Sequence, residues 1–90
     1  MPRLFYTPAF ERKYKKLLKA HPGLKKRISE RLNLLEKDPY ASALRFHSLE
    51  GPLNDLYAVT IDYDLRVIID AHFDADAFYL VDIGSHDDVY

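Results

Sequence analysis

Three prolines limit where helices can begin and end in the first half of this chain: Pro8, Pro22 and Pro39. A threonine before Pro8 suits a helix N-cap, because proline is well tolerated at the first helical position. Apolar residues recur at helical spacing between the prolines: Phe10, Tyr14, Leu17 and Leu18, then Leu24, Ile28, Leu32 and Leu35. The pattern predicts a hairpin of two helices, the second ending before Asp38-Pro39.

From residue 46 the hydrophobic pattern changes to a period of two, which is typical of strands. Three apolar stretches separated by acidic turns are predicted as strands: residues 56–61, 65–69 and 78–83. A short strand is expected at residues 3–6, and a further one near residues 46–49. We therefore predict a single α+β domain over residues 1–90, with two N-terminal helices packed on a twisted antiparallel sheet of three to four strands.

The formal net charge of −1 conceals a segregation of charge along the chain. Residues 1–45 hold twelve Lys and Arg against four Asp and Glu, whereas residues 46–90 hold one against ten. Such segregation indicates a polyanion or an acidic partner at one end of the molecule. The chain has no cysteine and no apolar run of membrane-spanning length, so we expect a cytoplasmic protein that uses no thiolate chemistry and enters no membrane.

Arg66 is the only basic residue of the second half, and it interrupts a strand of Leu, Val and Ile. An ion pair with Asp62, Asp64 or Asp70 would explain it structurally. A functional explanation is an anion clamp, because a guanidinium presents a planar fork of donors that suits phosphate and keeps its charge at neutral pH.

Two of the four histidines stand where the chain enters and leaves the predicted sheet, namely His47 and His86. Imidazole is a natural proton shuttle near neutral pH, so both are candidates for proton transfer. His47 and His86 with Asp87 and Asp88 could instead bind a metal, but their spacing lacks a preorganised ligand motif. We expect no metal and no cofactor, because the sequence also lacks a glycine-rich phosphate loop and a dinucleotide motif.

Four segments resemble the RelE/ParE toxin superfamily of toxin-antitoxin modules, and most of all its YafQ-like mRNA-interferase branch: Phe10-Glu11-Arg12-Lys13, residues 47–51, residues 62–68 and residues 82–90. The resemblance covers nearly the whole chain. It implies a microbial ribonuclease-type fold, cleavage of mRNA at the ribosomal A site, and neutralisation by a cognate antitoxin in a hetero-oligomer.

The resemblance also implies site residues, with His47, Arg66 and His86 as catalytic groups and Tyr90 as the substrate-binding aromatic residue. Cleavage of RNA through its own 2′-hydroxyl needs a base, an acid for the leaving 5′-oxygen, and a cation for the charge on phosphorus. The two histidines and Arg66 provide this set, and Tyr90 could stack on a base or pack at the chain end.

Other functions are compatible with the same residues. A ParE-type protein of this fold would inhibit DNA gyrase by binding, without catalysis. A catalytically degenerate homologue would bind only the antitoxin, and a small interaction module would need none of the histidines. The acidic second half is unlike the basic surface of many RNA-binding proteins, because attraction to phosphate dominates their affinity.

Overall fold

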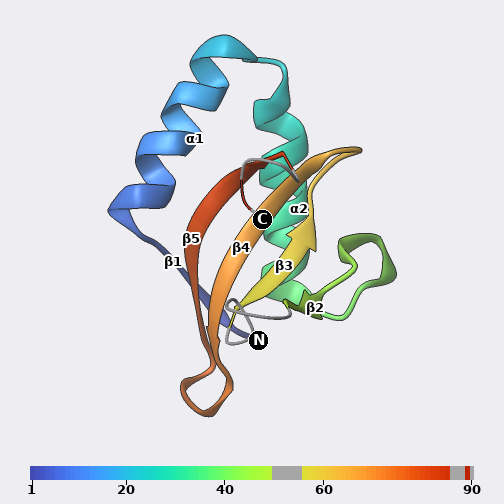
Figure 1. The fold of residues 1–90 in the computed structure, drawn as a ribbon. Coiled ribbons are helices and arrows are strands. Elements are labelled where there is room, and N and C mark those ends of the chain that lie inside the picture. The colour runs from blue at the N-terminus through green and yellow to red at the C-terminus, as the bar shows by residue number, and fades with distance from the viewer. Residues whose placement is uncertain (50–55, 86–88, 90) are drawn as a thin grey trace.

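The computed structural model describes residues 1–49, 56–85 and 89 (Figure 1). Its two long helices are α1 (Pro8–Ala20) and α2 (Leu24–Lys37). Its five strands are β1 (Arg3–Tyr6), β2 (His47–Ser48), β3 (Tyr57–Thr60), β4 (Leu65–His72) and β5 (Ala77–Ser85). Short 3₁₀ turns precede β2 and join β4 to β5: η1 (Ser42–Leu44) and η3 (Phe73–Ala75). Within this described part, no helix is both long and apolar enough to cross a bilayer.

Both helices lie where the prolines predicted them. The Thr7 hydroxyl caps α1 by accepting from the Phe10 N–H at 3.2 Å, and it also donates to the Leu80 carbonyl at 2.8 Å. The cap therefore ties the start of α1 to β5. Helix α2 ends at Lys37, where the Asp38 N–H donates to the Leu34 carbonyl at 2.7 Å, just before Pro39.

The sheet has the strand order β1-β5-β4-β3-β2. The fold class is confirmed, but the sheet has five strands instead of three to four and is mixed instead of antiparallel. Strands β3, β4 and β5 form the expected antiparallel meander, whereas β1 runs parallel to β5 from Arg3 beside Ala77 to Tyr6 beside Leu80. Turn signals reveal pairing only between neighbours in sequence, and β1 pairs with a strand from the other end of the chain.

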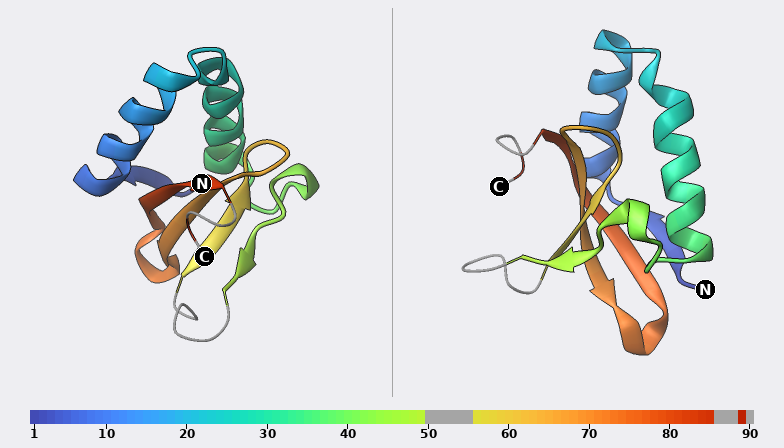
Figure 2. Two further views of the ribbon diagram at one scale, coloured as in Figure 1. Left: turned by 45° about the horizontal axis from the view of Figure 1, so that its top comes forward. Right: turned by 90° about the vertical axis from the view of Figure 1, so that its right-hand side faces the viewer.

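The two helices cover one face of the sheet, as the right-hand view of Figure 2 shows. The main core lies between the helices and the sheet, and its buried residues form one cluster: Phe10, Ile28, Leu32, Leu35, Leu44, Val59, Ile61, Val67, Ile69, Phe78, Leu80 and Ile83. The opposite face, here called the open face, carries a smaller buried cluster of Leu49, Ala58 and Ile68. Alternate residues of a strand point to opposite faces, so this division fixes the direction of every side chain on β3 and β4.

Candidate active site

Arg66 lies on the open face of the sheet. Its strand neighbour Val67 is fully buried in the main core, and successive side chains of a strand point to opposite sides. Arg66 pairs with Thr60 on β3 and with Gly84 on β5. Because Gly84 has no side chain, nothing projects over Arg66 from the β5 position beside it, as expected where a ligand approaches a strand.

The Arg66 guanidinium lies near two backbone oxygens, at the outer limit of hydrogen-bond distance. Its Nη1 lies 3.5 Å from the carbonyl oxygens of both Asp62 and Tyr63, in the turn that joins β3 to β4. Among residues 1–49, 56–85 and 89, Arg66 forms no ion pair, and Asp70 pairs with His72 instead, at 3.2 Å. The predicted ion pair of Arg66 with an aspartate is therefore not observed among the described residues.

His47 lies on the same open face, because it pairs with Ala58 of the smaller cluster. Its Nδ1 lies 2.6 Å from the carbonyl oxygen of Arg45. A carbonyl only accepts, so Nδ1 carries the hydrogen of the neutral ring and Nε2 holds the lone pair. Arg45 adopts a left-handed backbone conformation with φ of 49°. The chain reversal at Arg45 thus orients His47 with Nε2 able to accept a proton.

The structure brings His47 and Arg66 to one face but not into contact. His47 of β2 pairs with Ala58 of β3, and Ala58 pairs with Ile68 of β4. Ile68 is two residues after Arg66 on β4. Strand spacing of about 4.8 Å and a rise of ~3.4 Å per residue place their Cα atoms about 12 Å apart. The Arg66 guanidinium also points toward the turn, away from His47. A substrate would have to span the two groups.

His86 and Tyr90 lie outside the described residues, as do Asp87 and Asp88 of the alternative metal set. His86 follows Ser85, which pairs with Leu65 at the start of β4. In the part of the chain that the structure describes, no group of three His, Cys, Asp or Glu side chains could hold a metal ion.

Sequence reasoning missed two arginines beside Arg66. A cleft of about 460 Å³ opens at the edge of β3, where β2 pairs only with Tyr57 and Ala58 and ends short of Thr60. We call it the arginine cleft, and its polar lining consists of Arg31, Ser42, Arg45, Thr60, Asp62, Tyr63 and Arg66. Arg31 comes from α2 and Arg45 follows η1. Arg31 and Arg45 are far from Arg66 in sequence, so no local pattern indicates that the three side chains lie together. The one available sign was that Arg45 is the last basic residue before the acidic half.

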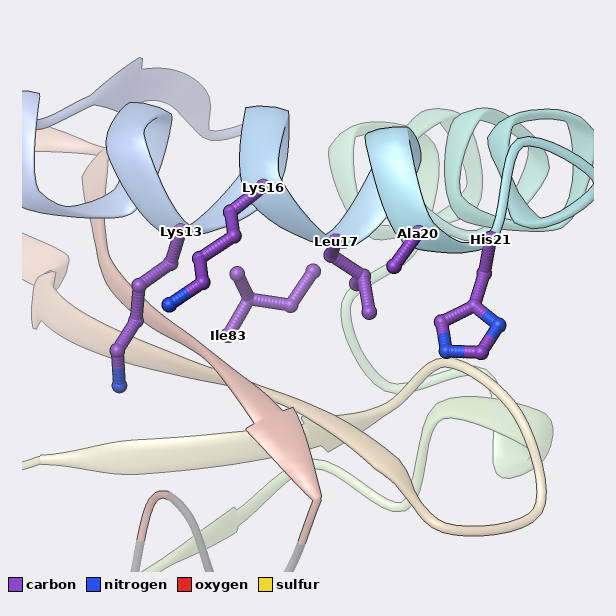
Figure 3. Close-up of a pocket in the computed structure, with 6 residues that line it drawn as sticks. All are labelled: Lys13, Lys16, Leu17, Ala20, His21 and Ile83. Carbon is purple, nitrogen blue, oxygen red and sulfur yellow. The ribbon is translucent and has the colours of Figure 1, made fainter.

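A second cleft of about 380 Å³ lies between α1 and the end of β5. Figure 3 shows that Lys13, Lys16, Leu17 and Ala20 of α1, and His21 just after the helix, lie on the side of α1 that faces the sheet, where Ile83 of β5 completes the lining. Lys13 forms an ion pair with Asp82, with 2.6 Å between Lys13 Nζ and Asp82 Oδ1. This cleft contains none of the predicted catalytic residues, so the open face and the arginine cleft remain the candidate site.

Structural comparison identifies toxins with the same architecture. A metal-bound toxin from Helicobacter pylori is 24% identical over all of both chains, with a TM-score of 0.81. YafQ from Escherichia coli BL21(DE3) is 14% identical over 100% of this chain and 99% of its own, again at 0.81. A YoeB/ParE toxin from Agrobacterium tumefaciens is 14% identical over 96% of this chain and 99% of its own, at 0.76.

The chain has the fold of these toxins. The match to YafQ extends to its structure in the Escherichia coli DinJ-YafQ toxin-antitoxin complex, at a TM-score of 0.77. Comparison of the sequence with family models and with curated proteins finds no match. The likeness is therefore one of architecture that spans both chains almost completely, with little sequence identity.

Proposed function

We propose that this chain is the toxin of a type II toxin-antitoxin system and cleaves mRNA on the ribosome. The observation that carries the proposal is the Arg66 guanidinium, which lies on the open face of a YafQ-like fold and contacts only carbonyl oxygens, at 3.5 Å, among the described residues. A cation in that state can bind a phosphodiester without first losing a carboxylate partner.

In the proposed reaction the 2′-hydroxyl of the RNA attacks the adjacent phosphorus. A base removes the 2′-proton as the 2′-O–P bond forms, and an acid protonates the 5′-oxygen as the P–O5′ bond breaks. The products are a 2′,3′-cyclic phosphate and a 5′-hydroxyl end. Arg66 stabilises the negative charge that develops on the phosphoryl oxygens between these two steps.

His86 and Arg66 form the core of the proposed site, with His47 as the second proton-transfer group. Support for His47 comes from its hydrogen bond to Arg45, which leaves Nε2 with the lone pair. Support for His86 is its position in the sequence, two residues after Gly84, the residue of β5 that pairs with Arg66. Tyr90 is proposed to stack on a base or to contact the phosphate.

An antitoxin is the proposed partner. The solved DinJ-YafQ complex shows that a protein of this fold is bound by one. Antitoxin binding would silence the toxin, and the resulting hetero-oligomer would be the resting form in the cytoplasm.

The test is inducible expression of the wild type, Arg66→Ala, His86→Ala and the control Arg27→Ala, which replaces an exposed arginine of α2. We expect growth arrest and 5′-hydroxyl cleavage products, mapped by primer extension on ribosome-bound mRNA, for the wild type and the control only. Equal arrest by all four proteins would remove Arg66 and His86 from the site. Growth arrest with intact mRNA and altered DNA supercoiling would instead identify a gyrase inhibitor, and harmless induction would indicate a degenerate homologue.

A further inference from the structure

Arg31 and Arg45 take no part in the chemistry proposed above, yet both line the cleft that contains Arg66. Arg31 is half-buried and Arg45 is exposed. Neither forms an ion pair with any residue that the structure describes. The only carboxylate in the described lining is that of Asp62, so three guanidinium groups face one negative charge. The described lining therefore carries a net positive formal charge.

The cleft has the chemistry of a phosphate site. Guanidinium groups bind phosphate oxygens through pairs of parallel hydrogen bonds. The hydroxyl groups of Ser42 and Thr60 provide further donors in the same lining. Its volume of about 460 Å³ exceeds the space of a single inorganic ion and admits part of a polymer backbone.

The backbone at Arg45 links this cleft to the proposed catalytic face. Arg45 presents its carbonyl to His47 Nδ1 at 2.6 Å and lines the cleft beside Arg66. Its left-handed conformation, with φ of 49°, is uncommon for a residue other than glycine and marks a position that the surrounding structure holds in place. A chain seated in the cleft would therefore continue onto the face that carries His47 and Arg66.

An acidic peptide fits the cleft less well than a nucleic acid does. A peptide interface gains most of its affinity from apolar or aromatic anchors in well-packed pockets. Among the described lining residues, only Ala43 and Ile61 are aliphatic, and Ile61 is fully buried in the main core. Tyr63 is the one aromatic side chain of that described lining, and the remaining lining groups are charged or carry a hydroxyl.

We propose that Arg31 and Arg45 bind a backbone phosphate of single-stranded RNA next to the phosphate that Arg66 contacts. The choice of RNA as the ligand rests on the proposed function. The two arginines are binding residues in this scheme, and they hold the strand in register at the open face without touching the reacting atoms.

The experiment measures RNA binding without cleavage. A fluorescein-labelled 2′-O-methyl RNA oligonucleotide, which cannot be cut through its 2′-oxygen, is titrated with purified protein by fluorescence anisotropy over a range of KCl concentrations. The variants are Arg31→Gln and Arg45→Gln, and the control is Arg27→Gln, one helical turn before Arg31 on the exposed surface of α2. Circular dichroism establishes that each variant is folded.

We expect each of the two cleft variants to raise Kd severalfold and to lower the magnitude of the slope of log Kobs against log salt concentration by up to about 0.7, the value for complete loss of one phosphate contact on a single strand. Arg27→Gln should leave both quantities at the wild-type value. Arg31→Lys, which keeps the charge and loses the planar fork, should retain the salt slope.

Each outcome separates this inference from the proposed function. RNA binding that depends on Arg31 and Arg45, together with intact mRNA in induced cells, would support the RNA-binding role of the cleft and contradict the proposed nuclease activity. If mRNA is cleaved in induced cells but the cleft variants bind RNA as well as the Arg27 control does, the RNA-binding role of the cleft is wrong and the proposed nuclease activity stands. A wild type that binds poly-glutamate but not the RNA would overturn the inference in favour of an acidic peptide.

Discussion

The two faces of the sheet differ in what their residues do. The helix-covered face buries a continuous core that includes Phe10, Ile69 and Leu80, and this face provides most of the apolar burial that stabilises the domain. Among the described residues, the open face buries the cluster of Leu49, Ala58 and Ile68, with Leu56, Val81 and Val89 packed against it, and it presents Arg66 and His47 to solvent. The helices thus cover one face with a continuous apolar core, whereas the other face combines a smaller buried cluster with polar side chains.

The largest effect is expected from shortening adjacent isoleucines of β4 that point to opposite faces. Ile69 is 0% exposed in the main core and Ile68 is 2% exposed in the smaller cluster. Ile69→Ala should lower the free energy of unfolding by about 4 kcal/mol and Ile68→Ala by about 2 kcal/mol, because a thinly covered site collapses around its cavity more readily. Urea unfolding with unchanged m values measures both. Equal losses would show that the open face contributes as much stability as the helix-covered face.

A smaller effect, confined to activity, is expected at His47. An asparagine can place its amide N–H near the position of the imidazole Nδ1 and donate to the Arg45 carbonyl, but it has no proton-transfer group. His47→Asn should therefore fold like the wild type and cleave RNA about 100-fold more slowly, the lower end of the range for general acid-base catalysis. Single-turnover cleavage and a thermal melt provide the two readouts. If His47→Asn cleaves RNA at the wild-type rate, His47 has no part in proton transfer, and its role is limited to the hydrogen bond with Arg45.

The smallest effect is expected where the basic helices meet the acidic sheet. Lys13 of α1 contacts Asp82 of β5 at 2.6 Å, with side chains 48% and 27% exposed. Removing this exposed pair with Lys13→Ala should cost about 0.5 kcal/mol of unfolding free energy, and the loss should shrink in ~1 M salt as screening increases. Lys16→Ala, in the same cleft, is the matched control. A loss of unfolding free energy above ~2 kcal/mol, or a loss that salt does not change, would mean that this ion pair is a major contributor to the packing of α1 on the sheet.

Part of the candidate site could be read from the sequence. Arg66 was identified because a lone cation in an apolar strand is unusual, and its placement on the open face follows from the strict alternation along β4. The histidine candidate His47 followed from its position at the entrance to the sheet. The assignments of His86 and Tyr90 stay predictions, because these residues lie outside the described chain. Arg31 and Arg45 could not be found, since only the packing of α2 and η1 against the β3 edge brings them to Arg66.

The local structure of this protein follows from short-range patterns in its sequence. Proline positions, the Thr7 cap and the change from helical to strand periodicity specify the two helices and the meander, because each depends on residues a few positions apart. Tertiary structure decided the parallel pairing of β1 with β5, the hydrogen bond that sets the His47 ring, and the arginine cleft. These features join segments that are distant in sequence or depend on a single strained backbone angle, and no periodic pattern records them.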